Sequence, residues 1–115
     1  MEGDLQNRTK EFSLDTVAFY SSLPNGEVYY TLGKQLLRSG TSVGANTRSA
    51  FRGRSNKEFI AKLGVVIEEA DESIFWLELL EKQQDINNDK LKALKEEANE
   101  LVSIFVSIVK KSKNR

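Results

Sequence analysis

Glutamates at helical spacing are the residues of this chain that would most readily do chemistry, and they form two groups. The residues are Glu68, Glu69, Glu72, Glu96, Glu97 and Glu100. Helical bundles that hold two metal ions use inward-facing glutamates together with histidines. The chain has no His and no Cys, so the common metal ligands, the neutral-pH proton shuttle and a thiol nucleophile are all missing. We therefore interpret the glutamates as a solvated acidic face, and we expect no metal, no cofactor and no enzyme activity.

Basic residues are the second group of residues that could serve a function, because they can bind anions. The stretch 36–60 reads LLRSGTSVGANTRSAFRGRSNKEFI and carries five of them. The total charge is balanced, with 17 Lys and Arg against 17 Asp and Glu, so composition alone gives no argument for a nucleic-acid or membrane partner. Only the placement of the charges in the fold can provide one.

Four helical segments must position these residues, and they predict an all-α fold in a single domain of 115 residues. The expected helices span about 9–22, 27–52, 55–82 and 89–110. Thr9 is the expected first N-cap, Pro24 ends the first helix, and Ser55 with Glu58 forms a capping box before the third. Short links make sequence neighbours antiparallel, which predicts an up-down-up-down four-helix bundle.

Apolar spacing predicts which faces are buried. The third helix has a 3-4 rhythm at Ile60, Leu63, Ile67, Ala70, Ile74 and Leu77, and the fourth has the same rhythm at Leu91, Leu94, Ala98, Leu101, Phe105 and Ile108. Gly33, Gly40 and Gly44 share one side of the second helix, which favours close approach by a neighbouring helix. The alternative is that this helix bends or breaks at 40–42.

In such a bundle, three distant segments meet at one end, which we call the basic pole. Its cations are Arg8, Lys10, Arg48, Arg52, Arg54, Lys57, Lys62, Lys110, Lys111, Lys113 and Arg115, and its acids are Glu2, Asp4, Glu11 and Glu58. The expected nucleic-acid-binding residues are Arg48, Arg52, Arg54, Lys57 and Lys62. Arg38 is left out because it should lie level with Glu69, Asp71 and Glu72 and form an ion pair. The alternatives are lysines that are merely solvated, or pairing of basic and acidic ends between subunits.

Apolar residues outside the expected core predict an interface between subunits. The candidates are Val65, Phe75, Trp76, Leu79, Val102 and Val106, with Phe75 and Trp76 as the anchors. The alternative is that the third helix is simply the most buried one.

The central stretch also resembles a known family. The shared features are the run 35–46, Arg48, Arg54-Ser55, Glu58-Phe59-Ile60, Lys62-Leu63 and Trp76-Leu77. They resemble the four-helix bundle proteins encoded by intervening sequences of bacterial 23S ribosomal RNA. They are also similar to the accessory variability protein of diversity-generating retroelements, which binds RNA and a reverse transcriptase through a basic surface. The resemblance implies a ring, most often a homopentamer.

We therefore expect a non-enzymatic, oligomeric bundle that binds RNA through the basic pole, with a reverse transcriptase as a possible protein partner. The alternative is an oligomeric scaffold without a nucleic-acid ligand. The first residues include acids and no apolar run, which is unlike a signal peptide. No apolar stretch approaches the roughly 20 residues that span a bilayer, so we expect a cytoplasmic protein without membrane contact.

Overall fold

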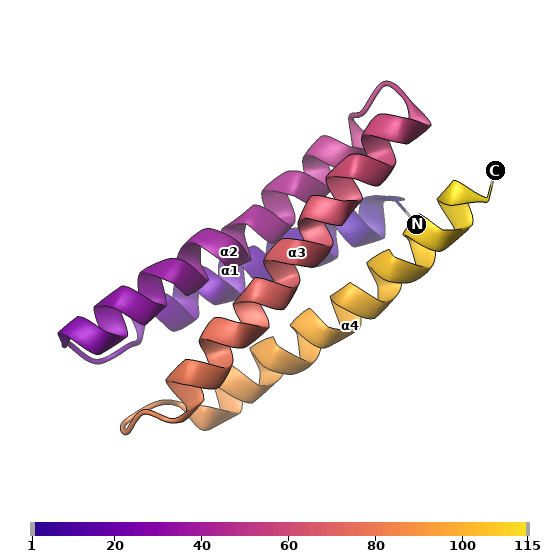
Figure 1. Ribbon diagram of the computed structural model, residues 1–115. Coiled ribbons are helices and arrows are strands. Elements are labelled where there is room, and N and C mark those ends of the chain that lie inside the picture. Colours follow the sequence, from indigo (N-terminus) through magenta and orange to yellow (C-terminus); the bar gives the residue numbers. More distant parts are fainter. Residues whose placement is uncertain (1, 115) are drawn as a thin grey trace.

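A computed structural model of the chain describes residues 2–114, and all regular structure in that range is helical. The helices are α1 (Glu2–Ser21), α2 (Glu27–Phe51), α3 (Asn56–Glu81) and α4 (Asn88–Lys113). They lie side by side in a bundle of 48 × 21 × 19 Å, consistent with the predicted up-down-up-down order (Figure 1). Within residues 2–114, no helix is both long enough and apolar enough to cross a membrane.

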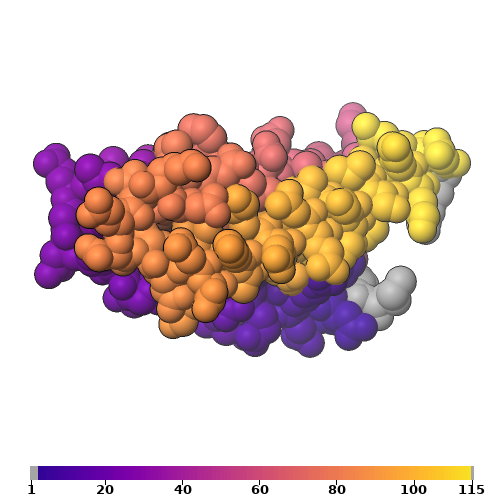
Figure 2. Space-filling view, turned by 90° about the horizontal axis from the view of Figure 1, so that it is seen from below, coloured from indigo at the N-terminus to yellow at the C-terminus, as the bar shows by residue number. Residues whose placement is uncertain are grey.

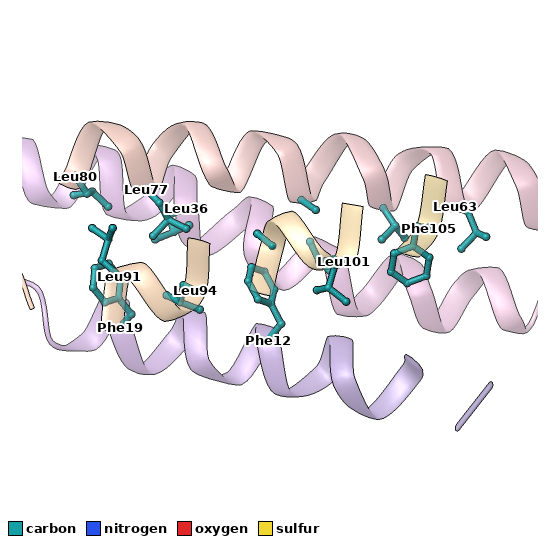
Figure 3. Packing of buried hydrophobic residues seen from close by; sticks show 14 of the residues in the cluster. Phe12, Phe19, Leu36, Leu63, Leu77, Leu80, Leu91, Leu94, Leu101 and Phe105 are labelled. Atoms are coloured by element: carbon teal, nitrogen blue, oxygen red, sulfur yellow. The ribbon is translucent and has the colours of Figure 1, made fainter. Parts of the chain in front are cut away.

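The core runs along the whole length of the bundle and receives side chains from all four helices (Figure 3). Phe12 and Phe19 of α1 point into it, and Phe105 of α4 fills the end near Leu63. Each large apolar side chain that is fully buried stabilises the fold by about 1.5–3 kcal/mol. Thr9, Thr16, Thr47, Ser39 and Ser73 are also fully buried. Their hydroxyls are satisfied by backbone carbonyls or by each other, so polar groups fit in the core without an unpaired atom.

The buried face of α3 differs from the predicted one by part of a turn. The fully buried residues are Leu63, Val66, Ala70, Ser73, Leu77 and Leu80, whereas Ile60, Ile67 and Ile74 are only half-buried. Both sets have 3-4 spacing, so periodicity could not separate them. The buried register places the Ser73 hydroxyl 2.8 Å from that of Ser39 on α2. This pairing of two small polar residues leaves the isoleucines near the surface.

α2 is continuous from Glu27 to Phe51, so the alternative of a break at 40–42 is wrong. The glycines on its side allow the predicted close approach of a neighbouring helix, which is α1. A Cβ atom on Gly40 would lie 2.5 Å from Cγ2 of Thr16, and one on Gly44 would lie 2.6 Å from Oγ of Ser13. The Ser13 hydroxyl donates instead to the carbonyl of Gly40 at 2.9 Å.

α1 begins much earlier than predicted, at Glu2. Thr9 is not an N-cap. It is fully buried, and its hydroxyl donates to the carbonyls of Leu5 and Gln6 within the same helix. The second predicted cap is correct, because Oγ of Ser55 accepts the backbone N–H of Glu58 at 3.1 Å.

Candidate functional site

The three segments of the basic pole do meet at one end of the bundle. Figure 1 shows the start of α1, the α2–α3 link and the end of α4 at the same end. Asn56 Nδ2 at the start of α3 donates to the carbonyl of Ser112 near the end of α4 at 3.1 Å. A hollow between α1 and α4 is lined by Leu5 on one side and by Ile104 and Lys111 on the other. In Figure 2, α1 (indigo) runs alongside α4 (orange to yellow).

The five predicted nucleic-acid-binding residues lie within the last turn of α2, the α2–α3 link and the first turns of α3. Arg48, Arg52, Arg54 and Lys57 are exposed, and Lys62 is half-buried. None of the five forms an ion pair with a side chain of residues 3–114. Arg52 directly follows the last residue of α2 and comes four residues after Arg48. Arg115 and the Glu2 side chain fall outside the described part of the chain.

A polar groove of about 310 Å³ joins Arg48 to α1. Its lining residues are Gln6, Asn7, Lys10, Ser13, Thr41, Gly44, Ala45 and Arg48. Two cations thus share a groove with amide and hydroxyl groups, the combination that contacts phosphate oxygens in nucleic-acid complexes. Lys10 is one of the predicted cations of the basic pole, whereas Gln6 and Asn7 were not predicted because they precede residue 9, the expected start of the first helix.

A second hollow, of about 560 Å³, lies at the α2–α3 link itself. Its apolar lining comes from Phe51, Phe59 and Ile108, and Arg54 lies on its rim. The two phenyl rings are tilted by 58° with centroids 5.4 Å apart, a favourable arrangement for an aromatic pair. Both phenylalanines are only half-buried, so apolar ring surface is open to solvent amid the cations.

Arg8 does not belong to the available charge of the basic pole, which corrects the sequence analysis. Its Nε and Nη2 donate to the two oxygens of Glu97 at 2.7 Å each, and Nη2 lies 3.1 Å from Oε1 of Glu100. These hydrogen bonds raise the pKa of the guanidinium above its usual value. Arg8 therefore stays charged and ties α1 to α4.

Arg38 is paired as predicted. Its guanidinium lies 3.2 Å from Oε2 of Glu69 and also contacts Glu72. With Glu97 and Glu100 held by Arg8, four of the six glutamates considered for metal binding are in ion pairs. Glu100 is still 63% exposed, whereas Glu69 and Glu97 are largely covered, so these glutamates neutralise arginines as well as facing solvent. Among the residues that the structure describes, no group of acidic side chains is arranged to hold a metal ion.

The predicted interface residues lie around the outer sides of α3 and α4. Phe75 is 50% exposed, Val106 38% and Val65 37%, whereas Trp76, Leu79 and Val102 are half-buried. Phe75 and Trp76 pack edge to face with ring centroids 5.1 Å apart. The exposed apolar residues are compatible with an interface, but the single chain leaves that assignment a prediction.

The valines of α4 and the isoleucines of α3 line one strip. Lys95 donates to Glu81 of α3 at 3.0 Å. Val102 comes seven residues after Lys95, and Val106 and Val109 follow at steps of four and three, so all lie on the same side of α4. Likewise Ile60, Ile67 and Ile74 precede Glu81 at steps of seven. Both stripes therefore flank the α3–α4 contact, and we call them together the α3–α4 strip.

Comparison with known proteins now decides the family. Residues 2–107 match the sequence profile of the 23S rRNA-intervening sequence proteins. The chain belongs to this family. The chain is also similar to the crystal structure of a protein of unknown function from the S23 ribosomal protein family of Bacteroides thetaiotaomicron. It is 34% identical in sequence, with a TM-score of 0.86 over 95% of this chain and 97% of that one. No curated protein sequence matches the chain.

Membership in the 23S rRNA-intervening sequence family confirms the resemblance deduced from the central stretch, and the related structure agrees with the four-helix architecture. The family is described only as 23S rRNA-intervening sequence proteins. The name carries no biochemical activity, so the function must be argued from the surface of the bundle.

Proposed function

We propose that this protein binds RNA through the basic pole, with Arg48, Arg52, Arg54, Lys57 and Lys62 contacting phosphates. The observation that carries the proposal is that these five cations gather at one end and form no ion pair with any side chain of residues 3–114. In contrast, Arg8 and Arg38 are held in ion pairs with glutamates. Unpaired cations attract a polyanion because binding releases its condensed counterions.

The test is a titration of fluorescently labelled single-stranded RNA, followed by anisotropy at two salt concentrations. For about four phosphate contacts, raising salt from about 50 to about 200 mM should weaken binding about 50-fold. The double variant Arg52→Glu/Arg54→Glu should weaken binding at low salt by at least about tenfold, since two contacts become repulsive.

The matched control is Lys90→Glu/Lys92→Glu. It makes the same charge change in the first turns of α4, at the opposite end of the bundle, where both lysines are exposed. Its affinity for RNA should stay near that of the unaltered protein. If no RNA binds at low salt, or if both double variants bind equally well, the basic pole is not an RNA-binding surface.

A second candidate function is that of a homo-oligomeric scaffold, and the exposed apolar residues favour it. Among the predicted interface residues, Phe75, Val65 and Val106 are exposed on the outside of the bundle, where subunit contacts would cover them. We propose a homopentamer as the ring size, in keeping with the family resemblance. Native mass spectrometry provides the test, and a monomer at micromolar concentration would eliminate this candidate.

A further inference from the structure

The aromatic hollow at the α2–α3 link has a chemistry that phosphate binding does not use. Cations alone would suffice to hold a nucleic-acid backbone, yet Phe51 and Phe59 bring half-buried rings to this otherwise charged end. Ile108 of α4 lines the same hollow. We propose that this hollow receives an unpaired base of single-stranded RNA, which stacks on the phenyl rings. This inference rests on the proposed RNA-binding function and specifies the form of RNA that is bound.

The size and lining of the hollow suit a base. At about 560 Å³ it is open enough for a planar ring to enter, and Phe51, Phe59 and Ile108 supply the apolar part of its mixed lining. Ser55, Asn56 and Ser112 add hydrogen-bonding groups to the lining. Asn56 Nδ2 already donates to the backbone carbonyl of Ser112. The side-chain oxygen Oδ1 of Asn56 is therefore left to accept a hydrogen bond from the base edge.

The cations are placed to hold the backbone of the same nucleotide. Arg54 lines the hollow. In the sequence Phe51-Arg52-Gly53-Arg54, two arginines follow the aromatic residue within a tight link. Lys57 follows within the first turn of α3. Aromatic platforms beside cations are the arrangement with which proteins hold single strands irrespective of sequence.

Geometry also selects against a duplex. In double-stranded RNA the bases are stacked on each other, so the hollow would have no ring to receive and only the phosphates would be contacted. We therefore expect the protein to prefer unpaired strands or loops over helical RNA of the same length.

The experiment compares three labelled RNA probes of about 12 nucleotides, within the usual site size for single-strand binding. They are an oligouridylate, the same ribose-phosphate chain with abasic positions, and a blunt duplex. All carry the phosphates that the basic pole would contact, but only the first offers free bases. The oligouridylate should bind about tenfold more tightly than the abasic chain, the effect of stacking about one base.

A variant pair tests the location. Phe51→Leu keeps an apolar side chain but removes one ring, and it should reduce affinity for the oligouridylate while leaving that for the abasic chain unchanged. Tyr30→Leu removes an exposed aromatic residue (58% exposed) from α2 near the opposite end and should change neither. Far-UV circular dichroism checks that Phe51→Leu is folded, and the abasic probe tests the inference without any variant.

The two possible failures are distinct. If the oligouridylate, abasic chain and duplex bind equally well and with the same salt dependence, base stacking is refuted and the proposed function stands. If none of the probes binds at low salt, the proposed function fails and the stacking inference fails with it.

Discussion

Single glycines set the distance between α1 and α2. Thr16 is fully buried against α2, and its hydroxyl donates to the carbonyl of Phe12 at 2.8 Å. Its methyl and hydroxyl groups occupy the space that a side chain at Gly40 would need. The glycine therefore serves packing, which outweighs its poor helix propensity of about 1 kcal/mol relative to alanine.

Gly40→Ala should accordingly destabilise the protein. The new Cβ would lie 2.5 Å from Cγ2 and 3.0 Å from Cβ of Thr16, and such overpacking costs about 1–3 kcal/mol in free energy of unfolding. Gly64→Ala is the matched control, because the same substitution in α3 meets no atom within 4 Å. It should stabilise the protein by up to about 1 kcal/mol. Urea denaturation followed by circular dichroism measures both, and two changes of the same sign would contradict this account.

The cations show how far a sequence can predict a site. The pairing of Arg38 followed from counting residues back from the α2–α3 turn, because antiparallel neighbours fix which positions lie level. The pairing of Arg8 with Glu97 was not predicted, since α1 and α4 are joined by no link that fixes their register. The aromatic hollow was missed for a similar reason. Phe51, Phe59 and Ile108 come from three helices, and only the packed structure shows that they share one cavity.

The helices differ in how clearly the sequence defines them. α2, α3 and α4 begin and end close to the predicted residues because Gly26, Ser55 and the polar link before α4 mark their limits. α1 has no residue that signals its start. Thr9 was predicted to cap the helix, but it lies fully buried in the middle of it. α3 is apolar on more than one side, so its buried face was set by packing against Ser39 of α2 rather than by its own pattern.

The cap of α3 supports the link that carries Arg52 and Arg54. Ser55→Ala removes the acceptor for the backbone N–H of Glu58 and should lower the free energy of unfolding by about 1 kcal/mol. Ser55→Asn restores an acceptor without adding charge and should recover most of that loss. Thermal unfolding of both variants is the measurement. Equal melting temperatures for the two would mean that the cap hydrogen bond contributes nothing to stability.

Assembly of whole subunits is where the exposed apolar residues matter. Val106 is 38% exposed on the α3–α4 strip, so a single chain tolerates a charge there, whereas a subunit contact would bury that charge without a partner. Val106→Glu should therefore lower the native mass toward that of one chain. Val28→Glu introduces the same charge at a residue that is 53% exposed on α2 and should leave the mass unchanged. Identical masses for the two variants would place the interface elsewhere.

The salt dependence of assembly distinguishes an apolar subunit interface from pairing of the basic end of one subunit with the acidic end of another. The basic pole carries a surplus of cations, and an equal surplus of acids lies on the rest of this neutral chain. If the basic pole of one subunit bound the acidic end of another, contacts between exposed charges would weaken sharply as the screening length falls below about 10 Å, above about 0.1 M salt. Apolar contacts are not screened in this way. We expect the mass measured by light scattering to stay constant from about 50 to about 500 mM salt, while RNA affinity falls over the same range. A mass that falls over the same salt range would show that exposed charges, rather than apolar contacts, hold the subunits together.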